Sequence, residues 1–167
     1  MISVSDSSPL ITLSRAHQLE LLHDFYAQIA IPHEVYEQVV VAGAGLPGAE
    51  EVQGASWIRV HLGRSEPLEA IKAACVGLGR GEQSAIYLAS TLGADLVLID
   101  EGRARRAAKA VGLAVAGSIA ILERGAMLHK VADLRSVYLD LIAQGIRFDR
   151  KLLDQSLATL GLGKLNP

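Results

Sequence analysis

Short, continuously apolar runs alternate with segments of helical periodicity in this chain, and this alternation restricts the fold more than any other feature. The clearest run is residues 95–99 (DLVLI), which is typical of a strand buried on both faces of a parallel sheet. Similar runs occur at 2–5, 28–31, 57–60 and 113–116, and we expect 57–60 to form an edge strand. Strands that alternate with helices predict an α/β sandwich with a mostly parallel central sheet.

Helical segments separate the predicted strands. Ser8 is suited to an N-cap and Pro9 to a first helical residue, so we expect a helix from there to Phe25, interrupted near His17. Further helices are expected at about 32–42, 68–75, 79–92, 103–111, 118–125, 134–143 and 152–160, with Gly112 as a C-cap. Three glycines and a proline at 42–48 predict a loop.

The composition fits one folded domain. The 167 residues match the size of a single domain, and we expect 1–167 to form one, with about 126–167 as its C-terminal helical extension. A hydrophobic share of 50% with a net charge of −2 excludes intrinsic disorder, and Cys75 stands alone, which excludes an internal disulfide. The chain starts without a positive leader and has no apolar run of ~20 residues, so we expect a cytoplasmic protein.

Polar side chains follow the predicted strands at the point where each strand ends. Asp6 ends the first run, Asp100 follows DLVLI directly, and Ser118 lies just past the next run. The carboxyl ends of parallel strands meet at one edge of an open sheet, so we expect these three groups to face one crevice. The alternative is that each is only a turn or helix-cap residue.

Further acids lie near predicted helix starts. Glu82 is in the first turn of a helix whose next positions on the same face are apolar, where an unpaired carboxylate is costly. Glu34 and Glu37 come early in the helix after Pro32, where the helix dipole alone favours acids. Several carboxylates without a cysteine or histidine ligand pattern suit Mg²⁺ or Mn²⁺. Such a metal polarises a phosphoryl oxygen and activates water, which points to a phosphodiester substrate.

Four motifs resemble those of PIN domains. Residues 5–11 (SDSSPLI) resemble the family's opening motif, and 31–37 (IPHEVYE) resemble its second acidic segment. Residues 78–82 (LGRGE) and 98–108 (LIDEGRARRAA), continued by Gly117 and Ser118, resemble a branch of uncharacterised prokaryotic PIN-like proteins. The resemblance spans essentially the whole chain.

This resemblance implies a PIN-like three-layer α/β sandwich and a Mg²⁺- or Mn²⁺-dependent endoribonuclease, related to the VapC-type toxins of toxin–antitoxin systems. The implied residues are the acids Asp6, Glu37, Glu82 and Asp100, the metal ligands Asp6, Glu82 and Asp100, and the supporting Ser8 and Ser118. Glu34 competes with Glu37 as the second acid. Glu82 stands where many toxins of the wider family have an aspartate. The alternative is therefore an inactive nucleic-acid- or partner-binding module on the same fold.

Basic residues are the candidate contacts to RNA. The net charge of −2 does not indicate general electrostatic binding to nucleic acid, but it permits a local basic patch. We expect phosphate contacts from Arg80, Arg103, Arg105, Arg106 and Lys109, the alternative being a solvated helix face. Near the candidate elements the only aromatic residues are Trp57 and Tyr87, so recognition by base stacking is poorly supported.

The tail carries two apolar stripes. Their members are Leu134, Val137 and Leu141 in one helix and Leu153, Leu157 and Leu160 in the next. Because a small domain buries a limited area, we predict a homodimer through the helices between 113 and 160, or dimerisation with an antitoxin partner. The alternative is that both stripes complete the chain's own core.

Overall fold

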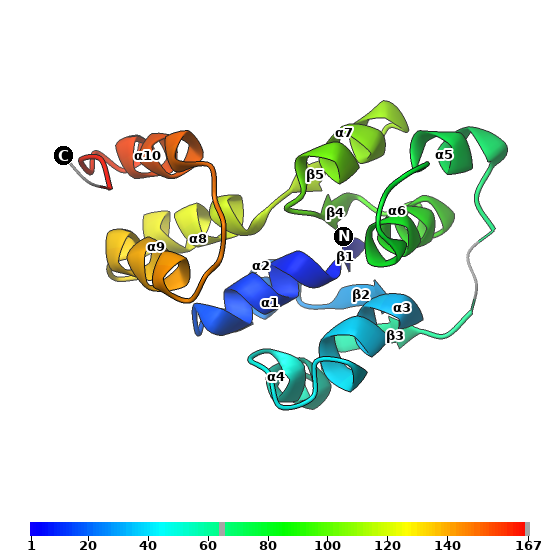
Figure 1. Ribbon diagram of the computed structural model, residues 1–167, viewed down its shortest axis with the longest axis horizontal. Coiled ribbons are helices and arrows are strands. Elements are labelled where there is room, and N and C mark those ends of the chain that lie inside the picture. Colours follow the sequence, from blue (N-terminus) through cyan, green and yellow to red (C-terminus); the bar gives the residue numbers. More distant parts are fainter. Residues whose placement is uncertain (64–65, 166–167) are drawn as a thin grey trace.

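The computed structural model describes residues 1–63 and 66–165. A parallel sheet of five strands lies at its centre, in the order β3-β2-β1-β4-β5 (Figure 1). The strands are β1 (Ser3–Ser5), β2 (Ile29–Pro32), β3 (Ile58–His61), β4 (Leu96–Leu98) and β5 (Val115–Ala116). Every predicted run overlaps a strand, with β2 and β3 each ending one residue later than expected, and β3 lies at an edge as predicted.

Helices connect these strands. They are α1 (Ser7–Arg15), α2 (Glu20–Tyr26), α3 (His33–Tyr36), the π-helical turn η1 (Glu37–Val41), α4 (Ala49–Gly54), α5 (Glu69–Ala74), α6 (Arg80–Leu92), α7 (Gly102–Ala110), α8 (Ser118–Met127), α9 (Leu134–Ala143) and α10 (Arg150–Thr159). The predicted break near His17 separates α1 from α2, and His17 has a φ of 55°. The sequence did not predict α4. None of the described helices is long and apolar enough to cross a bilayer.

Two apolar clusters cover the two faces of the sheet, which makes a three-layer sandwich. Val97 and Ile99 face a cluster built with α5, α6 and α7, while Leu98 between them faces a cluster built with α1, α2 and α8. This alternation follows from the period of two along a strand. The α/β class and the parallel sheet predicted from the sequence are confirmed.

The two tail stripes pack inward. Figure 1 shows α8, α9 and α10 gathered at one end of the molecule. Leu134, Leu141, Leu153 and Leu157 are at most 1% exposed, and Val137 and Leu160 pack against the same cluster. The stripes therefore complete the chain's own core, and the homodimer inferred from them loses its structural basis. Self-association itself stays a prediction.

The strand order places the amino-terminal strand at the centre of the sheet. From β1 the chain proceeds outward through β2 and β3 on one side, while β4 and β5 lie on the other side. The gap between β1 and β4 is therefore the switch point of the sheet, where ligands of open parallel sheets bind. The Asp6 amide donates to the Leu98 carbonyl at 3.0 Å, so the ends of β1 and β4 are joined there.

Candidate functional site

Strand β1 runs into helix α1 without a connecting loop. Asp6 is extended (φ −76°, ψ 172°) and is the N-cap of α1, which begins at Ser7. The prediction of Ser8 as the N-cap is therefore wrong, because no turn separates strand from helix. Pro9 falls within the first turn, where its missing N–H costs no helical hydrogen bond. This geometry fixes the Asp6 carboxyl at the sheet edge.

The Asp6 carboxyl is deeply buried. The residue is 1% exposed, and burial raises its pKa to about 6. The charge of Glu82 pushes the pKa the same way, while hydrogen bonds from Ser7 and Ser8 oppose the rise. Asp6 is in no ion pair within the described part of the chain. A buried acid with a strongly perturbed pKa is typical of a functional site.

Asp6 opens into a pocket of about 450 Å³, here called the acid pocket. Its lining includes Asp6, Ser7, Ser8, Glu34, Glu37, Gln38, Arg80, Gly81 and Glu82. One oxygen of Glu82 accepts the Gly79 amide at 2.8 Å, so Glu82 also caps its own helix. Glu37 lies 3.1 Å from His33 Nε2. Both Glu34 and Glu37 line the pocket, so the choice between them stays open.

The acid pocket also contains residues that the sequence reasoning missed. The Ser7 hydroxyl lies 3.3 Å from Asp6 Oδ1 and 3.1 Å from Gln38 Oε1, and it donates to one or the other. A Cβ on Gly81 would lie 2.8 Å from Gln38 Oε1 and 3.1 Å from Asp6 Oδ1. A side chain at this position would make the Gln38 amide shift and would crowd the Asp6 carboxyl. The signal in the sequence was the position of Ser7 and Gly81 directly beside predicted acids.

Glu37 begins a π-helical turn, in which the Ala42 amide bonds the Glu37 carbonyl at 2.7 Å, five residues back. Single π turns within helices occur frequently at functional sites. The periodicity of the sequence predicted an ordinary helix here. Because the turn holds one extra residue, it shifts the positions of Glu37 and Gln38 relative to those of a regular helix.

Asp100 is held by the first residue of α8. Its two carboxylate oxygens accept the Ser118 amide at 2.6 Å and the Ser118 hydroxyl at 2.5 Å. Burial raises the Asp100 pKa, while the Ser118 hydrogen bonds and the charge of Arg105 oppose the rise. Arg105 donates to the Ile99 carbonyl at 3.0 Å. Ser118 thus positions Asp100, and Arg105 is a neighbour of that carboxylate as well as a candidate phosphate contact.

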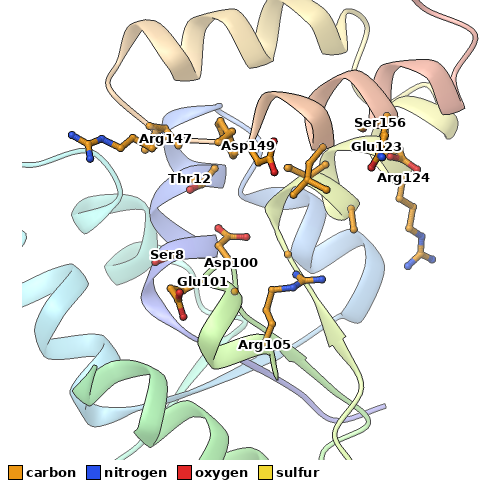
Figure 2. Close-up of a pocket in the computed structure, with 18 of the residues that line it drawn as sticks. Ser8, Thr12, Asp100, Glu101, Arg105, Glu123, Arg124, Arg147, Asp149 and Ser156 are labelled. Atoms are coloured by element: carbon orange, nitrogen blue, oxygen red, sulfur yellow. The ribbon is translucent and has the colours of Figure 1, made fainter. Parts of the chain in front are cut away.

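Asp100 faces a second and larger pocket of about 1040 Å³, here called the large pocket (Figure 2). Ser8 lines both pockets, so the two meet at the start of α1. The structure therefore brings Asp6 and Glu82 together on one side of Ser8 and places Asp100 on the other. Within residues 1–63 and 66–165, no three His, Cys, Asp or Glu side chains are grouped closely enough to hold a metal ion.

The other predicted contacts are spread over the surface. Arg80 lines the acid pocket. Arg103 and Arg106 lie beside Glu101, whose pKa they help to lower after the larger effect of the Arg103 backbone amide. These two arginines and Lys109 are exposed on α7 and line neither pocket.

The predicted aromatic residues lie outside both pockets. Trp57 is buried and stacks on His23 at 5.5 Å between ring centroids, and Tyr87 is likewise absent from either lining. Phe148 instead lines the large pocket. It was missed because it lies in a connecting segment with no recognisable motif.

Replacing Gly117 with alanine is expected to displace Asp100. The added Cβ would lie 2.8 Å from Asp100 Oδ1 and 3.2 Å from the Ile99 carbonyl oxygen, and neither neighbour moves freely. Overpacking of this kind costs about 1–3 kcal/mol of unfolding free energy. Urea unfolding measures the loss. Gly54→Ala, where an added Cβ meets nothing within 4 Å, is the matched control; equal stability of the two variants would contradict the prediction.

A family model described as a PIN domain matches residues 2–162. Among curated proteins no relative matches the sequence. The match includes the four motifs that resemble the family and all five strands. This chain therefore belongs to the PIN-domain family.

Proposed function

We propose that this protein is a Mg²⁺- or Mn²⁺-dependent endoribonuclease. PIN domains are commonly nucleases that use divalent metals. The observation that carries the proposal is the pair of carboxyls on either side of the β1–β4 switch point, Asp6 buried and Asp100 partly buried, both with a raised pKa. We extend the proposal to the toxin of a toxin–antitoxin pair, with an antitoxin protein as partner, because the PIN-like branch that the motifs resemble is related to the VapC-type toxins.

The donor atoms fit a hard divalent cation. The acid pocket offers carboxylate and amide oxygens and no sulfur, which is the ligand chemistry of Mg²⁺ and Mn²⁺. A cation would also offset the cost of burying the Asp6 carboxylate, which has no cationic partner in the described chain. Asp6 and Glu82 would hold it in the acid pocket, with Glu37 or Glu34 as a further acid. Asp100 would act on the substrate from the large pocket, on the other side of Ser8.

When bound, the metal would supply a polarised phosphoryl oxygen and a water of lowered pKa. The residues of the chain would orient the carboxylates and hold the substrate. Ser118 orients Asp100 through two hydrogen bonds, and Ser7 is poised to donate to Asp6. Arg80 at the acid pocket and Arg105 beside Asp100 are placed to hold the phosphates on either side of the cleaved bond.

A second candidate function is an inactive RNA- or partner-binding module. It is favoured by the hydrogen bonds that occupy Glu82 and Asp100: Glu82 caps α6, and Ser118 occupies both oxygens of Asp100. In this alternative the acids stabilise the fold, and the two pockets bind RNA or a protein partner without cleaving it.

RNA digestion distinguishes the two candidates. We expect the purified protein to cut single-stranded RNA in Mn²⁺ or Mg²⁺. EDTA should abolish cleavage, and added metal should restore it. Asp100→Asn protein, purified identically, excludes a contaminating nuclease. RNA that is bound but uncut in either metal would support the binding module, and RNA that is neither bound nor cut would remove both candidates.

A further inference from the structure

The large pocket extends well beyond the carboxylate that reaches it. Asp100 and Ser8 lie at one end, and the rest is formed by α1, α8, the segment 146–149 and α10. Its volume of about 1040 Å³ is at the upper end of the range for small-molecule sites. We infer that this pocket holds the base of an unpaired RNA nucleotide next to the cleaved phosphate, an inference that rests on the proposed ribonuclease function.

The walls of the large pocket suit a flat apolar ring. Ile119, Ile146, Phe148 and Leu152 line it, and Leu152 is 50% exposed, so apolar surface is left uncovered at the opening. The Phe148 ring is held by a tilted contact with buried Tyr138, at 6.4 Å between centroids. A fixed aromatic ring at a pocket wall is the usual platform on which an unstacked base lies.

The charges of the large pocket exclude a long phosphate track. Four carboxylates line it, on Asp100, Glu101, Glu123 and Asp149. Figure 2 shows the guanidinium groups of Arg124 and Arg147 pointing away from Asp100, and Arg124 lies 4.3 Å above the Phe25 ring instead. Arg105 is thus left beside Asp100 to meet a phosphate. These charges therefore allow one phosphate beside Arg105, at the Asp100 end of the large pocket, and an uncharged base deeper in the pocket.

The remaining polar groups match the edge of a base. The Gln155 amide offers both a donor and an acceptor, and the rim carboxylates of Glu123 and Asp149 accept hydrogen bonds from ring and amino N–H groups. A paired base has its Watson–Crick edge occupied and stays stacked in its helix. The pocket therefore selects single-stranded RNA, or an unpaired loop nucleotide, over a duplex.

Binding in EDTA tests this inference without cleavage. The probes are a labelled single-stranded RNA of mixed sequence and the same strand in a duplex. We expect Phe148→Ala to weaken single-strand binding by roughly 5- to 150-fold, the range for removing one stacking partner, and to leave weak duplex binding unchanged. Leu152→Ala, at an exposed position, should weaken single-strand binding without disturbing the fold. Leu139→Ala, 40% exposed on α9 and outside the pocket, is the matched control.

Several outcomes would overturn the inference: wild-type affinity in both pocket variants, equal loss for duplex and single strand, or no single-strand binding by the wild type. A basic amphipathic peptide that loses affinity in Phe148→Ala, while RNA binding is unchanged, would assign the pocket to a protein partner. The proposed function fails separately. If wild-type protein never cuts RNA but the pocket variants still lose single-strand binding, the pocket inference stands and the nuclease does not.

Discussion

Asparagine at Asp6 or at Asp100 is expected to lower metal-dependent RNA cleavage by at least about 10²-fold, because residues that only support a metal ligand already contribute roughly 10- to 100-fold. Each substitution keeps the shape of the side chain and removes its negative charge. Asp6 is buried and Asp100 is partly buried, and both lie at the carboxyl ends of the central strands β1 and β4. Rates on a fluorescent single-stranded RNA in Mn²⁺ measure the effect.

Asp140→Asn is the matched control, because Asp140 is exposed on α9 and lines neither pocket. It should cleave at the wild-type rate. A variant that unfolds without a cooperative transition is misfolded, and its cleavage rate would not be used in the comparison. Wild-type cleavage by a well-folded Asp6→Asn or Asp100→Asn protein would remove the proposed site.

The stability of the protein is expected to fall as the pH rises from about 4 to 6. The folded-state pKa of Asp6 is about 6, above its usual value of 3.8, so the folded protein binds more protons than the unfolded chain in that window. Stability therefore decreases with rising pH, and the cost levels off above pH 6 at roughly 3 kcal/mol. Asp100, whose pKa is also raised, contributes in the same direction.

Urea unfolding in EDTA at pH 4 to 8 measures this dependence. Asp6→Asn removes the ionisable group, so it should flatten the profile and exceed the wild type in stability at pH 7, even though it does not cleave. Asp140→Asn should reproduce the wild-type profile. A wild-type stability that rises with pH through this window would show that the Asp6 carboxylate is stabilised by its surroundings.

The sequence predicted the parts of the site that follow from strand periodicity. Continuous apolar runs identified the parallel strands, and the rule for their carboxyl ends placed Asp6, Asp100 and Ser118 at one edge. The all-parallel sheet is confirmed, and Ser118 hydrogen-bonds to Asp100. Asp6 and Asp100 line two pockets that share Ser8, where the sequence had predicted one crevice. The motif resemblance to PIN domains is likewise confirmed by the family match.

Other features depend on tertiary contacts that a sequence does not display. Asp6 could be identified as the N-cap only from the direct junction between β1 and α1. That Glu82 also caps α6 follows from the position of the Gly79 amide, which the sequence does not show. One of the two tail stripes was taken as surplus because the sequence does not show how much area α8, α9 and α10 bury against one another. Phe148 belongs to a pocket formed by segments more than one hundred residues apart in the chain, which no local pattern reveals.

The strand order also has a consequence for how the protein emerges from the ribosome. Asp6 is made early, whereas β4, which pairs with β1, begins ninety residues later, and Ser118, which orients Asp100, follows later still. Until that stretch has left the exit tunnel, β1 lacks the neighbour that completes the sheet edge, and long-range pairing of this kind forms late. A nascent chain therefore carries an incomplete set of acids. On the proposed function, we therefore expect the activity to arise only after most of the chain has been made.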